Sequence, residues 1–165
     1  MTASDAWLLE CSDTLTIAVS DHEMLEYIDA PLRFGVPGSP EYCSAVLLWQ
    51  ENLVPIMDVA ALLGHPQDEM NTRVSLLTYQ EKPGVALQQL AVNVVSAPQK
   101  VRVDDGQACE LAEEINTSVL MPISLSCFSH DDQPVIILDI ARLASAEFRD
   151  IVNDGQSSLV RSTGF

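Results

Sequence analysis

Two kinds of side chain in this 165-residue sequence, the thiols and the imidazoles, could bind a metal ion. The cysteines are Cys11, Cys43, Cys109 and Cys127, and the histidines are His22, His65 and His130. The cysteines are widely spaced, with no Cys-x-x-Cys pair, and no two histidines have the i, i+4 spacing of a helical metal site. The sequence therefore predicts free thiols, with no metal site and no cofactor.

The hydroxyl and carboxyl groups of the sequence do not form a recognisable catalytic pattern either. Ser44 follows Cys43 without the Gly-x-Ser-x-Gly elbow of a hydrolase nucleophile. Asp58 and Asp139 each precede a short apolar helical stretch and are most simply helix caps. A role in acid–base catalysis would need a partner carboxylate or histidine in a cleft, to which the sequence does not point. We predict that the protein is not an enzyme.

The charge balance narrows the choice of partners. The chain has 24 acidic and 8 basic residues, a net charge of −16, and its largest basic grouping is Lys100 with Arg102. Nucleic acids and anionic membranes would both be repelled. The N-terminal residues lack the basic and apolar regions of a signal peptide, and no apolar run is long enough to span a membrane. We expect a cytoplasmic protein whose acidic charge either keeps it soluble or attracts a basic protein surface.

Short apolar runs rich in Val, Ile and Leu dominate the sequence and predict an all-β fold. In residues 89–94 the large apolar side chains alternate, which is typical of a half-buried strand. The predicted strands are Trp7–Cys11, Leu15–Val19, Met24–Ile28, Ala45–Trp49, Leu53–Met57, Val74–Tyr79, Leu87–Val95, Lys100–Val103, Val119–Phe128 and Val135–Leu138.

Two stretches predict helix instead. After Asp58, one or two helical turns should end at Gly64, which can adopt the left-handed exit conformation. From Asp139 onward, apolar residues fall on one helical face, and Gly155 should end that helix. The tail of residues 156–165 is mostly polar, and we expect it to be disordered.

The two strand-to-helix junctions repeat one another. Asp58, Ala60 and Leu62 recur as Asp139, Ala141 and Leu143, each set after an apolar strand and a polar turn. The sequence thus predicts two similar half-domains, each a small barrel.

The sequence resembles the CheW-like domain family. Residues 53–64 match the family signature, in which Val-Pro, two residues and Asp lead into a Leu-rich turn that ends in Gly. Residues 15–28, 36–40, 90–105 and 135–143 resemble further family segments in the same order. The resemblance implies two five-stranded SH3-like barrels with short helices, including a C-terminal one, in a single domain over residues 1–155. It also implies a non-catalytic adaptor that binds the regulatory domain of a CheA-type histidine kinase and the cytoplasmic tip of chemoreceptors.

The chain departs from the family pattern on both sides of one strand. The first family Arg-Gly pair becomes Ser44-Ala45, and that Arg is associated with receptor engagement, which a serine cannot reproduce. The second Arg-Gly pair becomes Gln50-Glu51, and we expect Asn52 to supply the left-handed conformation that the hairpin requires. Binding to receptors is therefore left open.

We expect the partner-binding residues to lie on this hairpin and along the groove between the barrels. Trp49 is either an exposed anchor or a core tryptophan, and the groove residues are either a contact edge or ordinary core. The predicted set is Val19, Met24, Ile28, Ser44, Trp49, Gln50 and Glu51. Two alternatives remain from the sequence: a regulator that binds the kinase but not receptors, and a barrel that binds a small molecule.

Overall fold

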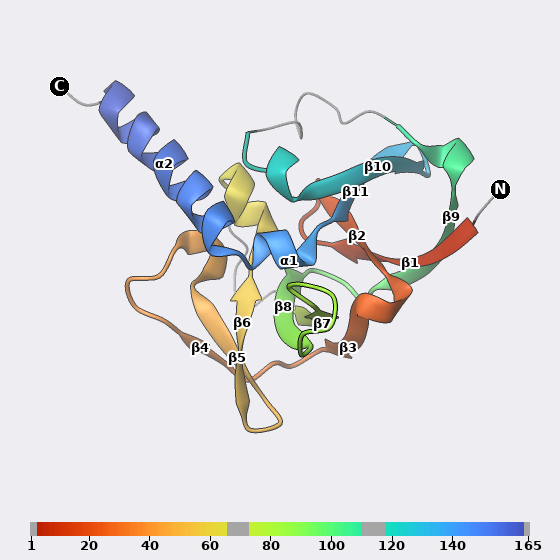
Figure 1. Ribbon diagram of the computed structural model, residues 1–165, viewed down its shortest axis with the longest axis horizontal. Helices are drawn as coiled ribbons and strands as arrows, with labels where there is room; N and C mark the ends of the chain where they lie inside the picture. Colours follow the sequence, from red (N-terminus) through yellow and green to blue (C-terminus); the bar gives the residue numbers. More distant parts are fainter. Residues whose placement is uncertain (1–2, 66–72, 110–117, 164–165) are drawn as a thin grey trace.

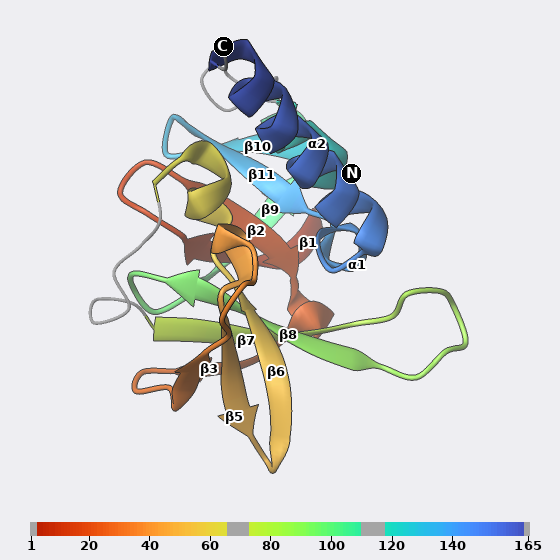
Figure 2. The same ribbon diagram turned by 90° about the vertical axis from the view of Figure 1, so that its left-hand side faces the viewer.

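The computed structural model describes residues 3–65, 73–109 and 118–163, with the backbone alone at residue 105 and residues 155–163. Its strands form two antiparallel-rich sheets, which lie one above the other in Figure 2. The strands are β1 (Ala3–Glu10), β2 (Thr16–Ser20), β3 (Met24–Ile28), β4 (Arg33–Gly35), β5 (Ala45–Trp49), β6 (Asn52–Met57), β7 (Arg73–Tyr79), β8 (Gln88–Val94), β9 (Gln99–Asp104), β10 (Ser124–His130) and β11 (Gln133–Leu138). The predicted all-β architecture of two SH3-like barrels is confirmed, although the second sheet has six strands in place of the predicted five.

The two sheets have the same topology apart from the additional edge strand β4, and each sheet takes strands from both halves of the chain. The first sheet has the order β10-β11-β2-β1-β9, and the second has the order β3-β7-β8-β6-β5-β4. The first hairpin of the chain, β1–β2, therefore lies in the same sheet as the C-terminal strands. The β7–β8 hairpin, in turn, joins β3 and β5–β6 from the first half. Two repeats that follow one another in sequence have exchanged their leading hairpins.

Between residues 42–62 and 123–143 the repeat holds at the level of single residues, with an offset of 81 positions (139 − 58 = 81). The turn residues 50 and 51 correspond to residues 131 and 132, and all four have positive φ. The amide of Asp58 donates to the carbonyl of Tyr42, and the amide of Asp139 donates to that of Ile123, both at 2.7 Å. The predicted internal repeat is therefore a repeat of backbone structure as well as of sequence.

Each sheet encloses its own apolar core, and the opposite faces of its strands build a third core between the sheets. Leu47, Val54 and Ile56 lie inside the second barrel, and their repeat counterparts Phe128, Val135 and Ile137 lie inside the first. Met57 and Leu138 are the last residues of β6 and β11, and both pack in the central core. Because side chains alternate along a strand, one strand can serve two cores.

This double use corrects the prediction of a half-buried strand at residues 89–94. Residues Leu90 to Val94 are all buried, since one face of β8 lines the second barrel and the other the central core. Asn93 is buried too, and its Oδ1 accepts a hydrogen bond from Arg33 Nη1 at 3.0 Å. Other strands differ at their ends. β4 was not predicted, and β10 begins at Ser124 because residues 121–123, which include a proline, form a 3-10 turn.

Both predicted helix caps are confirmed. Asp58 Oδ1 accepts from the amide of Ala61 at the start of the 3-10 helix η3 (Val59–Leu63), and Gly64 ends that helix in the left-handed conformation at φ 81°. Asp139 Oδ1 accepts from the amide of Arg142 and begins α1 (Ile140–Leu143). The remaining short 3-10 helices are η1 (Asp21–Glu23), η2 (Glu41–Cys43), η5 (Asp105–Gln107) and η6 (Met121–Ile123).

The C-terminal helix differs from the predicted one in an interruption after its first turn and in where it ends. It is interrupted after α1 and resumes as α2 (Ala146–Thr163), which projects from the body of the molecule in Figure 1. The interruption has a local cause: Ser145 Oγ accepts from the amide of Phe148 and so begins a second helix. The helix passes through Gly155 to Thr163, so the predicted end at Gly155 is wrong. The division at residue 155 into a domain and a disordered tail stays a prediction.

The β5–β6 turn also corrects an expectation. Gln50 and Glu51 have φ of 46° and 66°, whereas Asn52 is the first residue of β6, paired with Trp49. A two-residue hairpin turn of this kind needs positive φ at both central residues. The predicted left-handed role of Asn52 is therefore wrong, and two residues with long side chains adopt that conformation instead.

We expect Glu51→Gly to raise the free energy of unfolding by about 1 kcal/mol, because a side chain in the left-handed region costs roughly 1–2 kcal/mol. Urea denaturation followed by circular dichroism measures the change. Glu81→Gly is the matched control, since Glu81 is an exposed loop residue outside the set with positive φ. It should leave stability unchanged or lower it slightly. Equal effects of the two changes would contradict this account of the turn.

Candidate protein-interaction surface

Trp49 lies at the end of β5, between the interior and the rim of the second barrel. Its ring is partly buried against the core of that barrel, and its indole Nε1 donates to Glu26 Oε2 of β3 at 2.9 Å. A tryptophan commonly buries its apolar body and leaves its N–H at the wet edge. Trp49 therefore closes the barrel end and is not a freely exposed anchor, while the neighbouring Gln50 and Glu51 are exposed.

The outer face of β4, β5 and β6 carries a cluster of apolar side chains, which we call the β4–β6 patch. In the strand register Phe34 lies opposite Val46, which lies opposite Pro55, and in the next row Leu48 lies opposite Leu53. The amide of Leu48 also donates to the carbonyl of Leu32. The exposed fraction reaches 66% for Leu53 and 48% for Phe34. The patch consists of Leu32, Phe34, Val46, Leu48, Leu53 and Pro55.

The β4–β6 patch was missed in the sequence, although a signal was present. β5 is apolar at all five positions, Ala45 to Trp49, yet it belongs to a hairpin that only one barrel core can bury. A strand that is covered on one face needs apolar residues only at alternate positions. The extra apolar residues Val46 and Leu48 therefore face outward, and such an excess on the outer face of a sheet indicates a contact surface.

A groove of about 350 Å³ continues the patch toward the C-terminal helices. Val46 and Pro55 line both features, while Tyr42 and Cys43 of η2 and Arg149 of α2 line the groove further along. Burial raises the pKa of both Tyr42 and Cys43, and the nearby Arg149 charge only partly opposes it. Both groups are therefore neutral near pH 7, which makes Arg149 the charged side chain of the lining.

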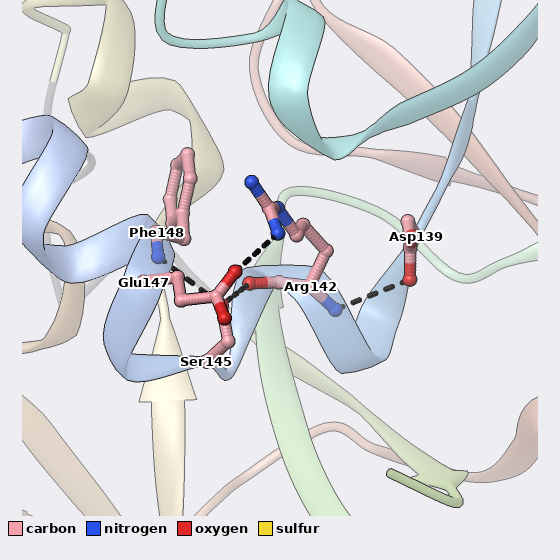
Figure 3. Close-up of polar contacts among 5 residues, drawn as sticks. All are labelled: Asp139, Arg142, Ser145, Glu147 and Phe148. Carbon is pink, nitrogen blue, oxygen red and sulfur yellow. Dashed lines mark hydrogen bonds and ion pairs between the residues drawn. The ribbon is translucent and has the colours of Figure 1, made fainter. Parts of the chain in front are cut away.

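The far side of this groove is held in place by a network at the α1–α2 corner, drawn in Figure 3. Ser145 Oγ donates to the carbonyl of Arg142 at 2.6 Å, and the Arg142 guanidinium pairs with Glu147 at 2.7 Å. Phe148 is fully buried and meets the ring of Tyr42 edge-on, with ring centroids 5.8 Å apart. The start of α2 is thus fixed to η2 across the groove.

The other predicted site residues have different surroundings. Val19 is fully buried in the central core, so its prediction as a contact residue is wrong. Met24 is partly buried against that core, and Ile28 is partly buried against the core of the second barrel. Ser44 is exposed and directly precedes β5, next to Cys43 in the groove. The sequence alone could not tell whether Val19 is buried or lines a groove, because an apolar residue in a strand suits either location.

Within residues 3–65, 73–109 and 118–163, no three side chains of His, Cys, Asp or Glu lie close enough together to hold a metal ion. The thiol of Cys11 is fully buried, and burial together with the charge of Asp58 raises its pKa. No helix of the described chain combines the length and apolarity that a bilayer crossing requires.

The class of protein is thus one of two SH3-like barrels joined through a shared core, with an apolar outer face on β4–β6. The family model of the CheW-like domain matches residues 11–148, well over half of the chain. The chain belongs to the CheW-like domain family, whose members are non-catalytic scaffolds of chemotaxis signalling.

A solved structure agrees with this assignment. The chain is similar to the crystal structure of the scaffolding protein TtCheW from Thermoanaerobacter tengcongensis, with a TM-score of 0.67 and 13% sequence identity. The similarity covers 90% of this chain and 92% of that one, and at this identity it shows the fold. A search of curated protein sequences gives no match.

We expect Trp49→Ala to lower the free energy of unfolding by about 2–3 kcal/mol, because it removes a large ring from the end of the second barrel. The adjacent change Leu48→Ala is the control. Leu48 points outward and is 40% exposed, so its loss should alter stability by no more than about 0.5 kcal/mol. Thermal or urea denaturation distinguishes the two, and a destabilisation by Leu48→Ala as large as that by Trp49→Ala would contradict the strand register.

Proposed function

We propose that this protein is a cytoplasmic adaptor that couples the regulatory domain of a CheA-type histidine kinase to chemoreceptors, or to a related two-component assembly. The observation that carries the proposal is the β4–β6 patch on a domain of the CheW-like family. Its exposed leucines and phenylalanine gather on one outer face of β4, β5 and β6, as expected of the apolar centre of a protein interface.

Charge around the patch supports a protein partner with a basic rim. Glu51 is exposed at the hairpin tip, and Glu26 lies beside Trp49. Acidic groups of this kind steer association and set the register of docking more than they add affinity. The net charge of −16 extends the same preference over the whole chain.

The groove beside Tyr42 and Arg149 suits a second partner segment. It adjoins the patch through Val46 and Pro55, and its walls come from both repeats of the chain. A helix or loop of a receptor tip could place apolar side chains there, as in helix-in-groove recognition. An adaptor needs two adjacent surfaces of this kind to hold two partners at once.

A second candidate function, a regulator that binds the kinase but not receptors, is favoured by one observation. Ser44 is exposed beside the groove where the family pattern has Arg. The hydroxyl of a serine can replace neither the charge nor the multiple donors of a guanidinium. The alternative of a small-molecule-binding barrel would need a closed apolar cavity, whereas the groove lies at the surface.

We expect Leu53→Asp to weaken binding to a CheA-type regulatory domain at least about tenfold, since it places a charge in the centre of an apolar contact. Isothermal titration calorimetry measures the dissociation constant. Leu87→Asp is the matched control, because Leu87 has a similar exposed fraction, 59% against 66% for Leu53, and lies outside the patch. Circular dichroism should show both variants folded. Unchanged binding by folded Leu53→Asp would exclude the patch as the kinase-binding surface.

We expect Ser44→Arg to strengthen binding to a chemoreceptor tip peptide severalfold and to leave kinase binding unchanged. Ser44→Gln is the control, because it adds a long polar side chain without the positive charge. Surface plasmon resonance against the kinase domain and the receptor tip separates the two candidate functions. Kinase binding with no receptor binding by the unmodified chain would favour the regulator, and tight receptor binding without the Arg would exclude it.

A further inference from the structure

Two free cysteines face each other at the edge of the first sheet. Cys109 follows β9 and η5 in the chain, Cys127 lies in β10, and their Sγ atoms are 2.7 Å apart. Cys127 is buried, while Cys109 is partly exposed. Among the four cysteines of the chain, these two are drawn together by the fold although 18 positions separate them in sequence.

The backbone between them has the geometry of a cross-strand pair. Ala108 forms an antiparallel bridge with Phe128, and the amide of Cys109 donates to the carbonyl of Cys127 at 3.1 Å. Cys109 and Cys127 are therefore the residue pair next to this bridge, and opposed residues of an antiparallel pair typically have Cα atoms about 4.5–5.5 Å apart. Disulfides join residues whose Cα atoms are about 4.4–6.8 Å apart, so no backbone movement is required.

The internal repeat explains why the pair lies here. With the offset of 81, Cys127 corresponds to Val46, and its partner Cys109 takes the place of Phe34 opposite Val46 in β4. In the second barrel this position is an apolar pair within the β4–β6 patch, in which Phe34 is exposed and Val46 is partly exposed. In the first barrel the same position, on the equivalent outer face, holds two thiols.

We propose that Cys109 and Cys127 are a redox modification site, at which a peroxide-class oxidant converts the two thiols to an intramolecular disulfide. Cytosolic disulfides are commonly transient and redox-sensing, and accessible thiols paired with a resolving cysteine are typical of such sensors. The more exposed Cys109 meets the oxidant, and the buried Cys127 lies in reach to resolve the product.

The reaction balances in two steps with hydrogen peroxide. The Cys109 sulfur attacks one peroxide oxygen, the O–O bond breaks, and Cys109 becomes a sulfenic acid as one water leaves. The Cys127 sulfur then attacks the Cys109 sulfur, the S–O bond breaks, and the S–S bond forms as a second water carries away the thiol proton. Two electrons pass from each thiol pair to each peroxide. Burial, with the hydrogen bond to Cys109 as a smaller cause, raises the pKa of Cys127 to about 12, which makes Cys127 the less reactive thiol toward peroxide and leaves the first oxidation to Cys109.

The test treats the folded full-length chain with hydrogen peroxide, blocks the remaining thiols with iodoacetamide in denaturant, and maps the peptides without reduction. We expect a Cys109–Cys127 linked peptide, two alkylated cysteines out of four, and full reversal by dithiothreitol. Because the bond closes a loop across 18 positions, the oxidised chain should melt roughly 5–10 °C higher.

Matched variants keep the result specific. Cys109→Ser should abolish both the linked peptide and the rise in melting temperature, whereas Cys43→Ser, at another partly exposed cysteine, should leave both unchanged. The proposal is overturned if Cys109 is oxidised to sulfinic acid while Cys127 stays reduced, if Cys109 links to another cysteine, or if both thiols stay reduced in peroxide. None of these outcomes depends on the proposed adaptor function, because no partner protein is present.

Discussion

Parallel pairing between exchanged hairpins is the constraint on which the rest of the structure depends. Ile17 and Ala18 of β2 pair with β11, and Ala91 and Val92 of β8 pair with β6. In this way β2 and β8 become interior strands with both faces buried, one against a barrel and one against the central core. Neither barrel can complete its sheet from its own repeat, so the two halves must fold as one unit, with the long-range contacts that such a topology entails.

Because the interior strands are buried on both faces, the outer faces of the β5–β6 and β10–β11 hairpins lie at the outside of the molecule. The β5–β6 hairpin of the second barrel carries outward apolar residues that no element of the described chain covers. Val46 and Pro55 of this hairpin also line the groove beside α2. Its counterpart in the first barrel, β10–β11, has the Cys109–Cys127 pair at the corresponding edge. The two repeats thus have the same backbone at this position but different side chains, apolar residues in one and two thiols in the other.

Conservation of backbone geometry also explains how this chain keeps the family fold at 13% identity to a solved CheW scaffold. The turn that replaces the family's Arg-Gly pair has Gln50 and Glu51 in the left-handed region, and Asp131 and Asp132 do the same in the other repeat. Strand pairing on both sides holds each turn in place, so a residue without the freedom of glycine is tolerated at a modest cost. The turn geometry is thus set by the hairpin it closes more than by its own residues.

The sequence by itself determined the strand-rich class, the family and the local junctions, because short-range rules govern them: Asp58 and Asp139 cap the helices that follow, and Gly64 takes the left-handed exit. Only the tertiary structure decided which hairpin joins which barrel, since strand exchange leaves the local pattern of each strand unchanged. For the same reason the sequence could not tell the buried Val19 from the exposed Leu53, or bring Cys109 to Cys127. An apolar residue at a strand position has two possible faces, and only long-range pairing determines which of them meets solvent.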